Sequence, residues 1–125
     1  IRPVEGTEYD FSTPREVGDT RLDINLVMNP DRDRKRPSAR AHCPRSGATL
    51  EMWTDEPGIQ VFDAFGMEIG TPGHDGQTYG RYAGLCLEAQ HLPDSLNNPD
   101  WPSIISTPET PYFQRLVVEI VRGEG

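Results

Sequence analysis

A short run around residue 88 gathers side chains that could move protons. The sequence GLCLEAQHLPDS, residues 84–95, ends an apolar stretch on Glu88 and continues at once into polar groups. In an extended strand, Glu88 shares a face with Cys86 and Gln90, while leucines lie on the opposite face. A carboxylate beside a half-buried sheet surface could act as a general base. The alternative is an ordinary surface glutamate on the outer face of a strand.

Two other polar residues, Asp23 and Gln60, fall in stretches that also alternate like strands. Carboxylate and amide groups can hydrogen-bond to the hydroxyls of a sugar, and an aromatic ring can cover the sugar's apolar face. Trp53, Phe62 and Tyr82 could supply that ring. As a set these residues are typical of a sugar site, whereas each one alone is better explained as an ordinary strand residue.

The histidines suggest several roles and define no site by themselves. His91 could be a general acid, but its Pro-rich surroundings favour a structural histidine that hydrogen-bonds within a turn. His74 lies in a Gly-rich stretch and is expected to face solvent. His42 and Cys43 are adjacent, but two potential ligands do not make a metal site. The sequence therefore predicts no bound metal.

The elements that would position these residues are short strands joined by long loops. Glycine and proline number 12 each, and no window repeats apolar residues at helical spacing, so we expect little or no helix. The alternation predicts strands over residues 20–29, 48–55, 59–65, 85–90 and 112–122. Loops are expected over residues 30–47, 66–84 and 91–103. This pattern predicts an all-β fold built from antiparallel strands.

Charge is unevenly distributed along the chain, whose formal net charge is −8. Residues 1–47 hold nine basic and eight acidic residues, a net of +1, whereas residues 48–125 hold three basic and twelve acidic residues, a net of −9. Such an acidic body repels phosphate backbones, so nucleic acid is not an expected partner. The mixed run DRDRKR is interpreted as the solvated tip of a loop.

The two cysteines and the ends of the sequence bear on its compartment. Cys43 and Cys86 lack the spacing of a CxxC or zinc motif. We expect two free thiols in a reducing compartment, which predicts a cytoplasmic location. No apolar run of 18 residues is present, so a membrane is not an expected partner. The chain opens IRPVEGTEYDF, with no signal-peptide pattern and no Met, and reads like the interior of a longer protein.

Four segments of the chain carry a family resemblance. GLCLEAQHLPDSLNNPDWPS, residues 84–103, closely resembles the signature of the aldose 1-epimerase (galactose mutarotase) family. Three other segments resemble family motifs in the same order: PVEGTEYDFSTPREVG, LDINLVM and EMWTDEPGIQVF. The resemblance covers nearly the whole chain. It implies an isomerase that interconverts the α and β anomers of a galactose- or glucose-type hexose.

The resemblance also implies a mechanism and roles for particular residues. In this family a glutamate takes the proton of the anomeric hydroxyl and a histidine protonates the ring oxygen, with no metal or organic cofactor. Glu88 matches the catalytic base, Asp23 matches an aspartate that binds sugar hydroxyls, and Gln60 matches a glutamine lining the sugar site. His91 belongs to the signature as a neighbour of the base rather than as the acid.

The family pattern also contains parts that this sequence does not match. The family's acid histidine, a sugar-binding arginine and a second histidine lie upstream of the PVEGT segment. The family fold is a large antiparallel β-sandwich, a supersandwich, so residues 1–125 are expected to be the C-terminal portion of a single such domain. We expect the N-terminal part of the same protein as a partner, either as a separate chain or as a further segment. The sequences DAF and PETP depart from the family pattern and leave the preferred aldose open.

Two other classes of function compete with an epimerase. The main alternative is a non-catalytic β-sandwich module that binds carbohydrate, which would lack a histidine reaching the sugar's ring oxygen. The other is an interaction domain that uses the charged loop at residues 31–40.

Overall fold

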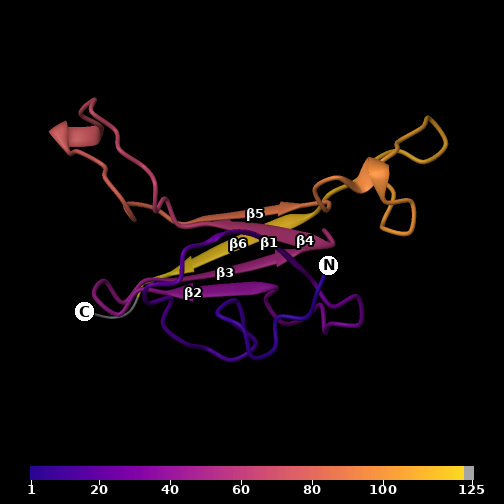
Figure 1. Cartoon of the computed structure of the whole chain (residues 1–125), viewed down its shortest axis with the longest axis horizontal. Helices are drawn as coiled ribbons and strands as arrows, with labels where there is room; N and C mark the ends of the chain where they lie inside the picture. The colour runs from indigo at the N-terminus through magenta and orange to yellow at the C-terminus, as the bar shows by residue number, and fades with distance from the viewer. Residues whose placement is uncertain (123–125) are drawn as a thin grey trace. The chain divides into compact units, whose positions relative to one another are not determined.

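The computed structural model of the chain describes residues 1–122, which form six β-strands and two short 3-10 turns (Figure 1). The strands are β1 (Asp23–Val27), β2 (Ala39–His42), β3 (Thr49–Thr54), β4 (Gly58–Phe62), β5 (Cys86–Gln90) and β6 (Leu116–Val121). The 3-10 turns are η1 (His74–Gly76) and η2 (Ser95–Asn97). The strands form two three-stranded sheets, ordered β1-β4-β5 and β2-β3-β6. The predictions of an all-β fold with almost no helix are therefore confirmed.

The chain divides into two compact units. One contains Ile1–Ile24 and Gln60–Leu87, and the other contains Asn25–Ile59 and Glu88–Gly125. Among the described residues, the apolar core of the first unit includes Leu22, Val61 and Ala64. That of the second unit includes Met52, Ile59 and Leu92. The predicted site residues are split between the units: Asp23 and Gln60 lie in the first, and Glu88 lies in the second.

The second sheet is antiparallel throughout. Strand β3 pairs with β2 on one side and with β6 on the other, with Trp53 opposite Val117 and Met52 opposite Val118. These pairs join β-branched and large apolar residues, which stabilise neighbouring strands by packing across the ladder. Met52 is almost fully buried and Trp53 is half-buried, as expected when successive residues of a strand point to opposite faces.

Strand β2 corrects the prediction of an uninterrupted loop over residues 30–47. Its four residues pair with β3 because the side chains match across the ladder. Arg40 lies opposite Glu51 and forms an ion pair of 3.1 Å with it. His42 lies opposite Thr49, and its Nδ1 is 2.9 Å from the threonine Oγ1. These partners are distant in sequence from the charged run, so local composition alone did not reveal the strand.

All five predicted strands are shorter than expected, and β1 covers only Asp23–Val27 of the predicted residues 20–29. Strand β4 ends at Phe62 rather than at residue 65 because Asp63 turns the chain. Oδ1 of Asp63 accepts a hydrogen bond of 3.0 Å from the Phe65 amide, and Ala64 adopts a left-handed φ of 59°. Strand β6 begins at Leu116, four residues later than predicted. The strands predicted over 20–29, 48–55 and 85–90 are confirmed as β1, β3 and β5.

Strand β6 is exposed along its whole length, and it ends the strand order of its sheet. Its apolar side chains, Leu116, Val117, Val118, Ile120 and Val121, are between 42% and 66% exposed. An edge strand of this composition is a surface on which further strands can pair.

Cys43 and Cys86 are both free and exposed. Within residues 1–122, no helix has the length and apolar character needed to cross a bilayer.

Candidate functional site

Asp23 in β1 and Gln60 in β4 meet although 37 positions separate them in the sequence. The Gln60 Nε2 donates a hydrogen bond of 2.8 Å to Oδ1 of Asp23. Asp23 is exposed and Gln60 is half-buried. Oδ2 of Asp23 and Oε1 of Gln60 can each still accept a hydrogen bond. The pair therefore presents acceptor groups suited to a ligand rich in hydroxyls.

A buried backbone contact next to Asp23 fixes this arrangement. The Leu22 amide donates a hydrogen bond of 3.0 Å to Oδ2 of Asp63, and the Asp63 amide donates one of 3.0 Å to the Leu22 carbonyl. Leu22 and Asp63 are both buried. Because Leu22 precedes Asp23 and Asp63 follows β4, these bonds hold β1 and β4 in one register, and the register determines which side chains meet.

The candidate rings lie in three different settings. Phe62 lies two residues after Gln60 on β4, so both side chains point to the same face of the strand. Its ring packs edge-to-face against Phe65 at 6.3 Å between centroids. Tyr82, in the same unit, is 51% exposed, and its amide donates a hydrogen bond to the Ala64 carbonyl. Trp53 belongs to the other unit and lines a groove described below.

Glu88 lies in the middle of β5 and is exposed. Of the residues sharing its face, Cys86 is exposed and Gln90 is half-buried. The expected half-buried surroundings are therefore present only on the Gln90 side. Strand β5 belongs to the three-stranded sheet that also contains β1 and β4. The structure brings Asp23 and Gln60 into contact, whereas Glu88 belongs to the other unit.

His91, just beyond β5, contacts a buried carboxylate that the sequence did not reveal. Its Nδ1 lies 2.7 Å from Oε2 of Glu56, whose side chain is 2% exposed. This contact is short but off the line of a well-aligned hydrogen bond, and no other described residue donates one to Oε2. It is a close contact between the imidazole and the carboxylate, which agrees with a structural histidine.

Tyr112 completes this cluster from a distant part of the same unit. Its hydroxyl donates a hydrogen bond of 2.5 Å to Oε1 of Glu56, and its ring lies 5.8 Å from that of His91. The hydrogen bond to Glu56 raises the pKa of Tyr112, and desolvation and the carboxylate's charge act in the same direction. The sequence singled out His91 of this cluster and placed Glu56 in a resembling segment, but an acidic residue in a turn is expected to be solvated, so the pairing was not predicted.

The charged loop contributes to the same region. Arg32 donates hydrogen bonds of 2.9 and 3.1 Å through Nη2 to the carbonyls of Thr54 and Glu56. Arg34 forms an ion pair of 3.2 Å with Asp55. Part of the DRDRKR run therefore holds the turn between β3 and β4, although most of its residues are exposed as predicted.

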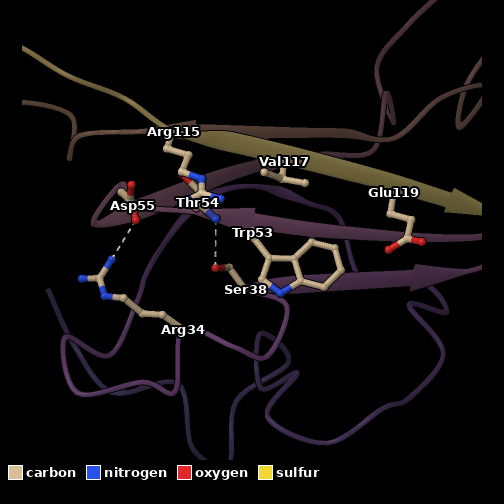
Figure 2. A pocket seen from close by; sticks show the side chains of 8 residues that line it. All are labelled: Arg34, Ser38, Trp53, Thr54, Asp55, Arg115, Val117 and Glu119. Carbon is tan, nitrogen blue, oxygen red and sulfur yellow. Dashed lines mark hydrogen bonds and ion pairs between the residues drawn. The ribbon is translucent and has the colours of Figure 1, made fainter.

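An open groove of about 500 Å³ lies beside β3 and β6 (Figure 2). It is lined by Arg34, Ser38, Trp53, Thr54, Asp55, Arg115, Val117 and Glu119. Figure 2 shows the indole of Trp53 between Ser38 and Glu119, and Nε1 of that indole donates a hydrogen bond of 3.3 Å to the Lys35 carbonyl. None of the predicted site residues Asp23, Gln60 and Glu88 lines this groove.

Residues 1–119 match the family model described as aldose 1-epimerase. Galactose mutarotase of Rattus norvegicus is 34% identical over 119 residues, which are 90% of this chain and 34% of that protein. Aldose 1-epimerase of Escherichia coli K12 is 26% identical over 113 residues, which are 82% of this chain and 32% of that protein. The chain thus spans about a third of the length of these curated relatives.

A solved structure resembles the fold as well. The crystal structure of an aldose epimerase homologue from C. elegans superposes with a TM-score of 0.85 at 22% identity. The match covers 98% of this chain and 39% of that one, so the fold described here recurs within a longer protein. The order of strands, the resembling segments and the match over residues 1–119 lead to one conclusion: the chain belongs to the aldose 1-epimerase family.

Proposed function

We propose that this chain is the part of an aldose 1-epimerase that supplies the general base, Glu88, and two groups that bind sugar hydroxyls, Asp23 and Gln60. The substrate would be a hexose of the galactose or glucose type. The observation that supports this most directly is the hydrogen bond of 2.8 Å between Gln60 and Asp23, on two strands of the sheet to which the Glu88 strand also belongs.

The proposed reaction requires a proton to leave one oxygen of the sugar and another to reach a second oxygen. Glu88 takes the proton from the anomeric hydroxyl, and the electron pair of that O–H bond forms the carbonyl at C1 as the bond to the ring oxygen breaks. A general acid gives its proton to the ring oxygen, so the charge on the sugar stays balanced. Rotation about the C1–C2 bond and closure by the reverse steps then yield the other anomer.

The roles of Asp23 and Gln60 follow from the direction of their hydrogen-bonding groups. A sugar hydroxyl can donate to the free oxygen of either side chain while the Asp23–Gln60 contact keeps both in place. Such contacts would hold the hexose while the ring opens, so that the open chain closes again without diffusing away.

The general acid is proposed to come from the remainder of the protein. Residues 1–125 would be the C-terminal portion of a single β-sandwich domain, with an upstream histidine completing the acid–base pair. The exposed apolar strand β6 is consistent with further structure adding to this chain. Because Cys43 and Cys86 are free, we expect the protein to work in a reducing compartment such as the cytoplasm.

Replacing Glu88 by glutamine tests the base directly. In the whole protein, Glu88→Gln keeps the size of the side chain but cannot accept the proton, so the catalysed rate should fall by about 10²–10⁴-fold. The rate would be followed by polarimetry from freshly dissolved α-D-galactose and α-D-glucose, after subtraction of spontaneous mutarotation.

Glu109→Gln is the matched control, because Glu109 is exposed in the turn closed by Thr107 and Thr110. It should leave the rate unchanged. Full activity in Glu88→Gln would remove Glu88 from the mechanism. A whole protein that binds galactose without accelerating mutarotation would instead be a carbohydrate-binding module.

A further inference from the structure

The buried carboxylate of Glu56 has no part in the proton transfers described above. Removing a carboxylate from water is expensive unless other groups replace its hydration. Here Tyr112 donates to Oε1 and Nδ1 of His91 lies 2.7 Å from Oε2. Since no other described residue donates to Oε2, that oxygen depends on His91 for its partner. The buried Glu56 carboxylate therefore restricts the positions of the Tyr112 and His91 side chains that pair with it.

The pairing also fixes the orientation of the imidazole. Because Nδ1 faces the carboxylate, the neutral ring is favoured in the tautomer that carries its proton on Nδ1. The ring of Tyr112 flanks the imidazole at an angle of 59°. The ring of His91 is therefore held on one edge by the contact with Glu56 and on another by packing against Tyr112, and its side chain is 25% exposed.

These contacts act on the chain directly after Glu88. The side chain of Gln114 donates a hydrogen bond of 3.0 Å from Nε2 to the Ala89 carbonyl. Leu92 is 6% exposed and packs close to Gly58, where an added Cβ would lie 3.0 Å from the leucine Cδ2. His91 lies between these two anchors. Glu88 is three residues before His91, which is at most about 10 Å of extended chain.

We propose that Glu56, His91 and Tyr112 position Glu88 by anchoring the chain that leaves β5, and that none of the three touches the sugar. This inference rests on the proposed function of Glu88 as the base. The anchor would prevent the end of β5 from shifting, since a displacement of about 1 Å at a reacting group can lower a rate by about 10²-fold. His91 would then be a positioning residue rather than the acid.

Variants of His91 separate positioning from a general loss of structure. In His91→Asn the amide nitrogen occupies the place of Nδ1 and can still reach Glu56, whereas in His91→Gln it lies one bond further out. In the whole protein, His91→Gln should lower kcat by at least about 10-fold with KM within about 2-fold, and His91→Asn should stay within about 3-fold of the wild type. A merely structural role gives no reason for such selective rescue when both variants melt at the same temperature.

Tyr112→Phe is a milder variant that keeps the His91–Glu56 pair. It removes one hydrogen bond to a charged group while keeping the ring, so kcat should fall by about 5-fold. Tyr79→Phe is the matched control, since it removes a phenol hydroxyl from a loop of the other unit and should leave kcat unchanged.

The outcomes distinguish this inference from the function on which it rests. Loss in His91→Gln with rescue in His91→Asn supports positioning. Wild-type kcat in both His91→Gln and Tyr112→Phe, beside an inactive Glu88→Gln, would overturn positioning and leave the function intact. Equal loss in His91→Gln and His91→Asn at equal melting temperature would also overturn it. Full activity in Glu88→Gln would overturn the assignment of the base instead.

Discussion

At the scale of single residues, the contact between Asp23 and Gln60 depends on which side chains of two strands face each other. A shift of one residue in either strand would turn one of these side chains to the opposite face. The bonds between Leu22 and Asp63 oppose that shift, because both residues are buried and each backbone is tied to the other. The two groups proposed to bind sugar are therefore held in place by the buried contact beside them.

Asp23→Asn tests the binding role of this pair. Asparagine keeps an oxygen that Gln60 can bond to but loses the negative charge. A hydrogen bond to a charged group contributes about 1.5–3 kcal/mol, against about 0.5–1.5 kcal/mol for one between neutral groups. KM for galactose should therefore rise by about 10-fold or more in the whole protein, with a smaller change in kcat. Asp100→Asn, at an exposed position, serves as the control. An unchanged KM in Asp23→Asn would exclude contact between this carboxylate and the sugar.

The residue scale also marks the limit of what the sequence could predict. Asp23, Gln60 and Glu88 could be singled out because each lies in an alternating strand and in a segment resembling the family. The partnership of Glu56 with Tyr112 joins positions 56 residues apart, and nothing in the local pattern of either residue indicates it. From the sequence, the glutamate directly before Pro57 is expected to lie in a solvated turn. Glu56 is instead buried, in the turn between the end of β3 and the start of β4.

At the scale of elements, the hairpin of β2 and β3 explains why one strand was missed. Four residues with the sequence ARAH show only a weak alternation, and the stabilising partners of Arg40 and His42 lie on β3. The turn between the strands is closed by the Gly47 amide, which bonds to the Cys43 carbonyl at 2.9 Å. Gly47 has a φ of 68°, which glycine adopts without the strain that a Cβ would bring.

The same turn activates Cys43 relative to an ordinary thiol. The side-chain hydrogen bond from Ser46 lowers the pKa of Cys43, and backbone amides of the turn and the charge of Arg45 add to the effect. A lowered pKa means that the reactive thiolate form is populated at lower pH. In a Cys86→Ser background, Ser46→Ala should move the pH midpoint of alkylation by iodoacetamide upward.

Ser103→Ala is the matched control for that experiment, because Ser103 lies outside the hairpin. It should leave the midpoint where it was. If the midpoint is the same with and without the Ser46 hydroxyl, the turn does not control the thiol.

At the scale of the whole molecule, the chain exposes an apolar edge strand that a complete sheet would usually cover or protect. Strand β6 would normally be protected by charge, by a bulge or by a neighbouring strand. Glu119 is its only charged residue, and Ile120 is 66% exposed. The chain also spans only about a third of its curated relatives, so the family fold has room for strands beyond those described.

The 125-residue chain by itself should therefore associate through β6. Ile120→Lys places a charge on this strand and should shift the sedimentation of the purified chain toward the monomer. Ile105→Lys introduces the same charge at a residue that is 68% exposed outside the sheets, and it should have little effect. Equal sedimentation of the Ile120→Lys and parent chains would show that association does not depend on β6.

Chemical rescue of the proposed base tests the role of Glu88 most directly. In Glu88→Ala the carboxylate is removed and a small space is left, which formate can enter. Mutarotation of α-D-galactose by the whole protein should be lost in this variant and restored in part as formate is added, while chloride at equal ionic strength restores nothing. Retention of the wild-type rate in Glu88→Ala, or a loss that formate does not relieve, would contradict the claim that Glu88 is the base.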